Sequence, residues 1–122
     1  MSARVLVLED DDSIREMVGL ALEDAGYAVA GARDGESAFE LLERDPVDLL
    51  VVDLRMPIMD GFEFIRRYTE GGGRAQIIVL SAARDVDLAG REMRAAAVIE
   101  KPFDLNDLLR TVARVTLASH GA

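Results

Sequence analysis

Short apolar runs alternate with longer amphipathic stretches along the whole chain. The apolar runs predict five strands, at residues 4–8, 27–30, 48–53, 76–80 and 95–100. Between Leu49 and Val52 every residue is apolar, which is typical of a strand buried on both faces of a parallel sheet. The strands are therefore expected to lie inside a layered fold, with helices covering both sides.

The stretches between the strands carry apolar residues at three- and four-residue spacing, which predicts helices. Asp12 or Ser13 is expected to cap the start of the first helix, and Gly26 is expected to end it. Gly90 interrupts the fourth helix, whose pattern is the weakest. The four helices after the first are expected at residues 34–46, 61–68, 84–94 and from 104 to about 117.

The alternation of strands and helices predicts an α/β fold, a doubly wound parallel sheet in a three-layer sandwich. With 122 residues, half of them hydrophobic, the chain is expected to form a single domain over 1–122, with a core at about 4–117. In such sheets ligands bind outside the carboxyl ends of the strands. Candidate functional residues are therefore sought at those ends.

Charge and composition exclude several classes of function. The formal net charge of −9 disfavours direct binding of this chain to nucleic acid, whose phosphates would be repelled. No run approaches the roughly 18 apolar residues of a membrane span. The first residues do not look like a signal peptide, so a cytoplasmic location is expected. There are no cysteines, which excludes disulfides and thiolate metal sites.

Chemically capable side chains follow four of the predicted strands. Glu9 and Asp10 follow the first, Asp53 ends the third, Ser81 follows the fourth and Lys101 follows the fifth. Carboxylate oxygens are the ligands that Mg²⁺ prefers, and an ammonium group can neutralise a phosphoryl group. The set therefore points to a metal ion and a phosphoryl group at one edge of the sheet.

Four short motifs occur in order, each at the end of its own strand. They are Leu8-Glu9-Asp10-Asp11, Asp53-x-x-Met56-Pro57-x-Met59-Asp60-Gly61, Ser81-Ala82 and Lys101-Pro102-Phe103. With these motifs the chain resembles the receiver domain of bacterial two-component response regulators, over about residues 4–117. The resemblance implies a flavodoxin-like five-stranded sheet in the order 2-1-3-4-5 with five helices. It also implies a signalling switch that receives a phosphoryl group from a histidine kinase or a phosphotransfer protein.

The resemblance assigns a role to each acidic residue of the motifs. Asp53 matches the phosphoacceptor, whose carboxylate attacks phosphorus to form an acyl phosphate. Glu9, Asp10 and Asp53, with the backbone carbonyl of Arg55, would hold Mg²⁺ or Mn²⁺. We also hypothesise that the Arg55 side chain overhangs the phosphoryl group and influences hydrolysis or partner choice. The alternative is an ordinary solvated arginine.

The resemblance further implies that Lys101 binds the phosphoryl oxygens, aided by a cis peptide bond to Pro102, and that Ser81 is drawn toward the new phosphoryl group. The face made by the fourth helix, fifth strand and fifth helix would then change its protein contacts. Family members usually carry an aromatic residue three positions before the lysine. Here that position is Val98, so the usual aromatic relay is not available.

Alternatives to the switch remain open from the sequence. A degenerate receiver would bind a protein partner without being phosphorylated, and Val98 keeps this alternative in play. A phosphatase of the haloacid dehalogenase type needs a second aspartate where Arg55 stands, which disfavours it. We expect no enzyme activity beyond the chain's own phosphorylation and dephosphorylation. A stand-alone regulator, a piece of a longer protein and a homodimer are all compatible with the sequence.

Overall fold

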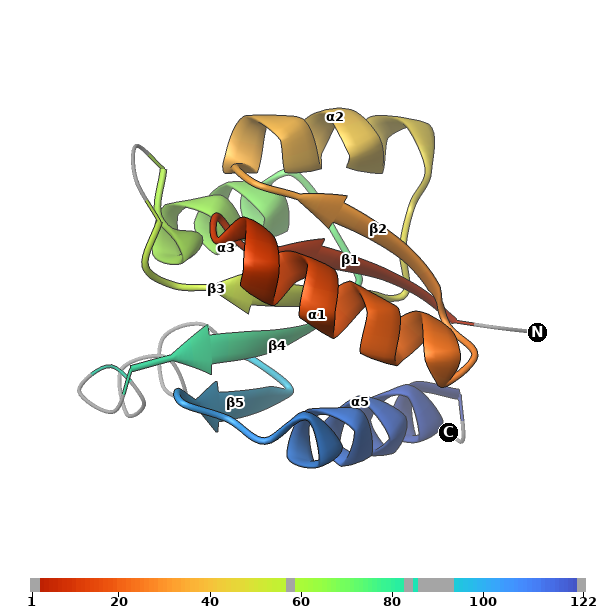
Figure 1. The fold of residues 1–122 in the computed structure, drawn as a ribbon. Helices are drawn as coiled ribbons and strands as arrows, with labels where there is room; N and C mark the ends of the chain where they lie inside the picture. Colours follow the sequence, from red (N-terminus) through yellow and green to blue (C-terminus); the bar gives the residue numbers. More distant parts are fainter. Residues whose placement is uncertain (1–2, 57–58, 83–84, 86–93, 121–122) are drawn as a thin grey trace.

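The computed structural model describes residues 3–56, 59–82, 85 and 94–120. Within them, five parallel strands form one sheet in the order β2-β1-β3-β4-β5, as predicted (Figure 1). The strands are β1 (Arg4–Leu8), β2 (Ala28–Ala32), β3 (Leu49–Asp53), β4 (Gln76–Ser81) and β5 (Ala97–Glu100). The chain leaves β1 in one direction along the sheet and continues from β3 in the other. The switch point of this doubly wound fold therefore lies between β1 and β3.

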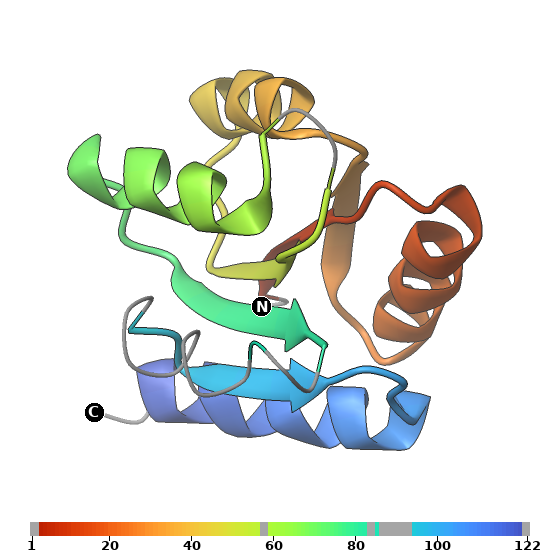
Figure 2. The same cartoon turned by 90° about the vertical axis from the view of Figure 1, so that its left-hand side faces the viewer.

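Four helices lie among the described residues and form the outer layers. They are α1 (Asp12–Asp24), α2 (Gly35–Arg44), α3 (Gly61–Glu70) and α5 (Leu105–His120). Helices α1 and α5 cover one face of the sheet, and α2 and α3 cover the other (Figure 2). The remaining helix, expected at residues 84–94, falls almost wholly outside the described residues. None of the described helices is both long enough and apolar enough to cross a bilayer.

The central strand β3 is apolar at four consecutive positions because both of its faces are covered by helices. Leu50 and Val52 belong to the core cluster shared with α2 and α3, whereas Leu49 and Val51 belong to the cluster shared with α1 and α5. All four side chains are fully buried. Because successive side chains of a strand point to opposite faces, a strand covered on both sides needs apolar residues at every position.

Helix starts are set by aspartates, although not always the predicted one. The prediction that Asp12 or Ser13 caps α1 is wrong, because Asp11 is the N-cap and accepts a hydrogen bond from the Ile14 amide at 3.0 Å. Three consecutive aspartates made the choice ambiguous from sequence. At the other end of α1, Gly26 has φ of +102°, as its predicted role as the left-handed residue after the helix requires.

Other boundaries differ from the prediction by one to three residues. Strand β2 begins and ends later than expected because its limits follow its pairing with β1, from Arg4 opposite Ala28 to Leu8 opposite Ala32. Helix α3 continues to Glu70 and α5 to His120, beyond the predicted ends. Pairing with β1, rather than local residue preference, decides the ends of β2.

Candidate functional site

The carboxyl ends of β1, β3, β4 and β5 meet at one edge of the sheet. Asp53 is the last residue of β3 and lies opposite Leu80, one residue before Ser81. In turn, Ser81 lies opposite Glu100, one residue before Lys101. On the other side of β3, Leu8 lies opposite Val52, so Glu9 follows at the level of Asp53. Parallel pairing therefore brings together residues that are as far apart as 92 positions in the sequence.

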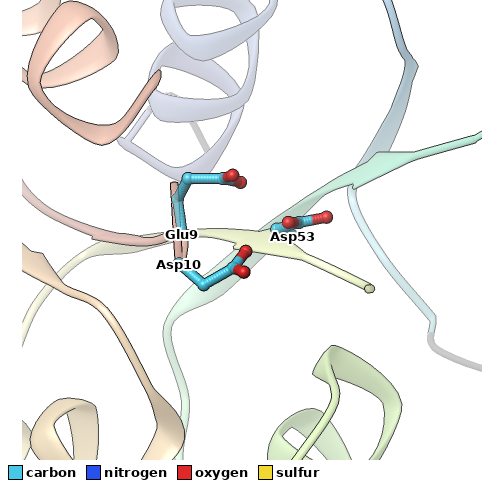
Figure 3. Close-up of side chains that lie close together, drawn as sticks. All are labelled: Glu9, Asp10 and Asp53. Atoms are coloured by element: carbon cyan, nitrogen blue, oxygen red, sulfur yellow. The ribbon is translucent and has the colours of Figure 1, made fainter. Parts of the chain in front are cut away.

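Three carboxylates form an acidic cluster at this edge. Glu9, Asp10 and Asp53 each offer an oxygen, and these oxygens all lie within 4.8 Å of one another (Figure 3). Glu9 and Asp53 are buried, whereas Asp10 is exposed and marks the side open to solvent. An all-oxygen donor set of three carboxyl groups fits a hard divalent cation, because the cation would bind the oxygens and offset the repulsion between the ionised groups. The predicted metal-binding side chains thus do lie together.

Lys101 provides the cation within this cluster. Its ammonium nitrogen lies 3.1 Å from Oδ1 of Asp53 and 3.5 Å from Oε2 of Glu9. Burial would lower the pKa of Lys101, but the two neighbouring carboxylates outweigh burial, so that its pKa lies above the ordinary value. The peptide bond from Lys101 to Pro102 is cis, as the resemblance implied. Lys101 is therefore charged and already beside Asp53 before any phosphoryl group arrives.

Within the acidic cluster, Glu9 has a pKa well above its ordinary value. Burial, together with a hydrogen bond to Asp53 and the charge of Asp53, raises the pKa of Glu9 from 4.5 to about 7. Lys101 and the Asp11 amide act in the opposite direction but do not cancel the rise. Two adjacent buried carboxylates are more stable when they share a proton than when both are ionised. In the metal-free site, Glu9 therefore retains its proton up to about neutral pH.

Backbone contacts hold Glu9 in place, and one of them involves a residue that sequence reasoning missed. The Glu9 amide donates to the carbonyl of Ala32 at 3.0 Å, which continues the pairing of β1 with β2. The guanidinium of Arg15 donates to the Glu9 carbonyl at 2.9 Å and also pairs with Asp12. Arg15 thereby ties the first turn of α1 to the acidic loop. An arginine within a helix gives no sequence signal of such a role.

Two residues that follow β3, Arg55 and Gly61, lie close to the end of that strand. The Arg55 amide donates to Oδ1 of Asp53 at 3.2 Å, and the Gly61 amide donates to the carbonyl of Leu54 at 3.0 Å. A Cβ atom at Gly61 would lie 2.5 Å from the Asp53 carbonyl oxygen, so that only glycine permits this approach of α3 to β3. The sequence prediction used Gly61 only as a helix start and did not foresee this contact.

Ser81 lies at the predicted place, but its hydroxyl is engaged elsewhere. The side chain is buried, and Oγ donates to the carbonyl of Ala82 at 3.0 Å. The backbone carbonyl of Ser81 accepts from the Lys101 amide at 2.7 Å, which links the ends of β4 and β5. The hydroxyl is therefore close to the site and bonded to the next residue of its own chain.

The side chain of Arg55 is not merely solvated. Its Nε and Nη2 donate to the two carboxylate oxygens of Asp85 at 2.9 and 2.7 Å, a forked contact between the segments that follow β3 and β4. Asp85 is buried, whereas about half of the Arg55 side chain is exposed. The hydrogen bonds and charge of Asp85 raise the pKa of Arg55 further. Asp85 was not predicted, because nothing in the sequence links residues 30 positions apart.

Comparison with known proteins supports the same family. A model of the response regulator receiver domain matches residues 5–113. The chain is 38% identical to the response regulator receiver protein CpdR of Brucella abortus, over 95% of this chain and 98% of that protein. It is 40% identical to the response regulator MprA of Mycobacterium ulcerans, covering 89% of this chain but only 48% of MprA. The solved structure of Vibrio cholerae CheY4, a chemotaxis response regulator, superposes with a TM-score of 0.82 at 34% identity, over 94% of this chain and 99% of CheY4.

Proposed function

This chain belongs to the family of response regulator receiver domains, which are phosphoacceptor signalling switches, and we propose that Asp53 is the residue that accepts the phosphoryl group. The observation that carries the proposal is the position of this carboxylate. It ends the central strand β3, is buried, lies within 4.8 Å of two further acids and lies 3.1 Å from the Lys101 ammonium. A nucleophilic carboxylate next to a cation suits attack on an anionic phosphoryl group.

The transfer itself requires little of the protein beyond placement and charge neutralisation. An oxygen of Asp53 forms a bond to phosphorus while the P–N bond of a donor phosphohistidine breaks, and its electron pair remains on the imidazole nitrogen. Lys101 offsets charge on the phosphoryl oxygens. Ser81 leaves the Ala82 carbonyl, to which it now donates, and hydrogen-bonds a phosphoryl oxygen. Hydrolysis of the acyl phosphate by water returns Asp53 to its starting state.

The acidic cluster is the proposed binding place of Mg²⁺ or Mn²⁺. Asp10 and Asp53 would bind the ion directly, Glu9 directly or through water, and the backbone carbonyl of Arg55 would complete the protein ligands. When bound, the ion supplies positive charge to the equatorial oxygens of the phosphoryl group. Glu9 would release its proton on binding, because a carboxylate ligand must be ionised.

The partners follow from this chemistry. A histidine kinase or a phosphotransfer protein in the cytoplasm would be the donor, and a protein target would read the phosphorylated state. Phosphorylation would bias an existing two-state equilibrium of the face that includes β5 and α5, together with the helix expected at 84–94. A homodimer formed through this face is one such readout. Residues 1–122 would act as a single domain with no catalytic activity beyond their own phosphorylation and dephosphorylation.

Mass spectrometry of the intact chain tests the proposal. The chain is incubated with Mg²⁺ and acetyl phosphate, and the expected phosphoryl adduct should be absent without Mg²⁺ and in Asp53→Asn. Asp48→Asn is the matched control, because Asp48 lies just before the amino end of the same strand and is exposed. It should form the adduct as the wild type does. If the wild type forms no adduct with acetyl phosphate or with a phosphorylated histidine kinase, the chain is instead a degenerate receiver that only binds partners.

A further inference from the structure

One ion pair at the phosphoacceptor edge has no part in the proposed transfer. Arg55 and Asp85 join the segments that leave β3 and β4, with both guanidinium–carboxylate distances below 3 Å. The pair is asymmetric, because the Asp85 side chain is only 7% exposed while that of Arg55 is 52% exposed. The surrounding protein therefore fixes the side chain of Asp85, whereas the half-exposed side chain of Arg55 is free to change its rotamer.

Backbone contacts place Arg55 within reach of the reacting group. Its amide donates to Oδ1 of Asp53 at 3.2 Å, so that the main chain of Arg55 already lies against the acceptor. From this anchor the side chain extends to Asp85, which follows β4 in the chain. Because an arginine side chain has several rotatable bonds and this one is half exposed, the guanidinium can change position by a change of rotamer, without movement of β3.

Asp85 is also linked to Ser81. The Asp85 amide donates to the carbonyl of Ala82 at 2.9 Å, and the hydroxyl of Ser81 donates to the same carbonyl at 3.0 Å. The carbonyl of Ala82 thus links the amide of Asp85 to the hydroxyl proposed to bind the phosphoryl group. Any change that loosens Asp85 acts on the same carbonyl that holds the hydroxyl of Ser81.

Charge supplies the reason for movement. The phosphoryl group on Asp53 carries about two negative charges, in addition to those of Glu9 and Asp10. A divalent cation and Lys101 offset about three of these four charges, which leaves roughly one negative charge at the open side. A guanidinium binds phosphate oxygens through the same planar fork that it now offers to the Asp85 carboxylate.

We propose that Arg55 is a second phosphoryl-binding cation, which Asp85 holds in reserve until Asp53 is phosphorylated. Phosphorylation exchanges the Arg55–Asp85 pair for an Arg55–phosphoryl pair and thereby releases Asp85, whose amide is bonded to the Ala82 carbonyl, from its contact with the residue that follows Leu54. The exchange couples the acceptor to the segment after β4 without an aromatic residue at position 98. The inference rests on the proposed role of Asp53.

The test compares rates of adduct formation from acetyl phosphate and Mg²⁺ in four proteins. Arg55→Ala removes the cation and should slow the reaction by about fivefold, the factor that one exposed pair supplies. Asp85→Asn frees the cation and should accelerate it by up to about the same factor. The double variant should behave as Arg55→Ala alone, since freeing a cation that is absent has no effect.

Opposite signs separate this role from a purely structural one. If the pair only stabilises the fold, both single variants shift the rate in the same direction or leave it unchanged, and either result overturns the proposal. Arg66→Ala is the matched control, because Arg66 is an exposed arginine of α3 that pairs with Glu63 away from the site, and its rate should equal that of the wild type. A wild type that forms no adduct would instead overturn the proposed function.

A second variant covers the case in which Asp85→Asn fails to fold. Arg55→Lys changes only the half-exposed partner, and it keeps the positive charge but cannot form the two-pronged contact with Asp85. It should form the adduct at least as fast as the wild type, whereas Arg55→Ala remains slower. Arg55→Lys as slow as Arg55→Ala would show that the contact with Asp85, rather than an available cation, supports the reaction, and the proposal would be wrong.

Discussion

Two glutamates of this protein sit beside cations and are affected in opposite ways. Glu63, on the outer face of α3, pairs with Arg66 at 2.7 Å and Arg67 at 2.9 Å, and hydrogen bonds from these arginines lower its pKa. Glu9, at the end of β1, lies 3.5 Å from Lys101, yet its pKa is raised to about 7. A cationic neighbour alone therefore does not decide the charge of a carboxylate.

Burial and the presence of a neighbouring acid explain why the two pKa values shift in opposite directions. Glu63 is partly solvated and faces two cations, whereas Glu9 is almost wholly buried and shares one cation with Asp53. Water stabilises an ionised carboxylate on the surface, while a buried carboxylate beside another is more stable when protonated. The sheet edge thus holds two adjacent buried carboxyl groups whose mutual repulsion a proton or a divalent cation can relieve, whereas Glu63 on α3 is already offset by two arginines.

The largest expected difference between the two sites is in the pH dependence of stability. The folded state retains the Glu9 proton above pH 4.5, whereas the unfolded chain has lost it, so that raising the pH favours unfolding until about pH 7. The free energy of unfolding of the metal-free protein should fall by about 3 kcal/mol across this window. Urea unfolding in a chelator at several pH values measures it.

Substituting each of the two glutamates in turn tests whether Glu9 causes this fall in stability. Glu9→Gln should remove most of the fall, because glutamine does not titrate. Glu63→Gln should leave the fall between pH 4.5 and 7 in place, since the Glu63 pKa is lowered and lies outside that window. Saturating Mg²⁺ should also abolish the fall by displacing the proton. An unchanged pH profile in Glu9→Gln would show that another group is responsible.

Removing the partly buried ammonium of Lys101 should slow phosphoryl transfer strongly. Lys101→Met leaves Asp53 and Glu9 without the ammonium that lies 3.1 and 3.5 Å away. The rate of phosphoryl adduct formation should fall by about 100-fold, as for the loss of one charge-stabilising group in an active site. Arg66→Met is the control and should have no effect on the rate. Equal rates for Lys101→Met and wild type would contradict the proposed role of Lys101.

The close approach beneath Asp53 should produce an intermediate effect. In Gly61→Ala the new Cβ would meet the Asp53 carbonyl oxygen, and α3 must move away from β3 to avoid it. We expect a loss of about 2 kcal/mol in the free energy of unfolding, typical of overpacking. Denaturant unfolding measures the loss. Gly26→Ala, whose Cβ meets no atom within 4 Å, separates steric overlap from the backbone strain of a positive φ.

The exposed pairs of α3 should show the smallest effect. Arg66→Ala removes contacts to Glu63 and Glu70, but half-exposed ion pairs contribute little to stability because water competes for both charges. The unfolding midpoint is expected to match that of the wild type within experimental error. A clear loss of stability would mean that the charges of α3 act as a network. The surface ion pairs would then contribute to stability as the charged groups at the sheet edge do.

Much of the fold and the residues of the candidate site could be predicted from the sequence. The apolar runs predicted five parallel strands, because a strand covered on both faces of a sheet is apolar throughout. The order of the strands was predicted from the resemblance to the receiver family, and the structure confirms it. Motifs at the strand ends predicted Glu9, Asp10, Asp53, Ser81 and Lys101, and parallel pairing brings all five to one edge. The roles of these residues and the metal they hold stay predictions until they are tested.

The sequence alone therefore determined what depends on neighbouring residues. This comprises the strand and helix periods, the turn at Gly26 and the set of reactive side chains. Only the tertiary structure decided which acid keeps its proton, which glycine admits a close contact and where Arg55 finds its partner. These properties depend on burial and on distances between residues far apart in the chain. A pattern of neighbours along a sequence contains neither quantity.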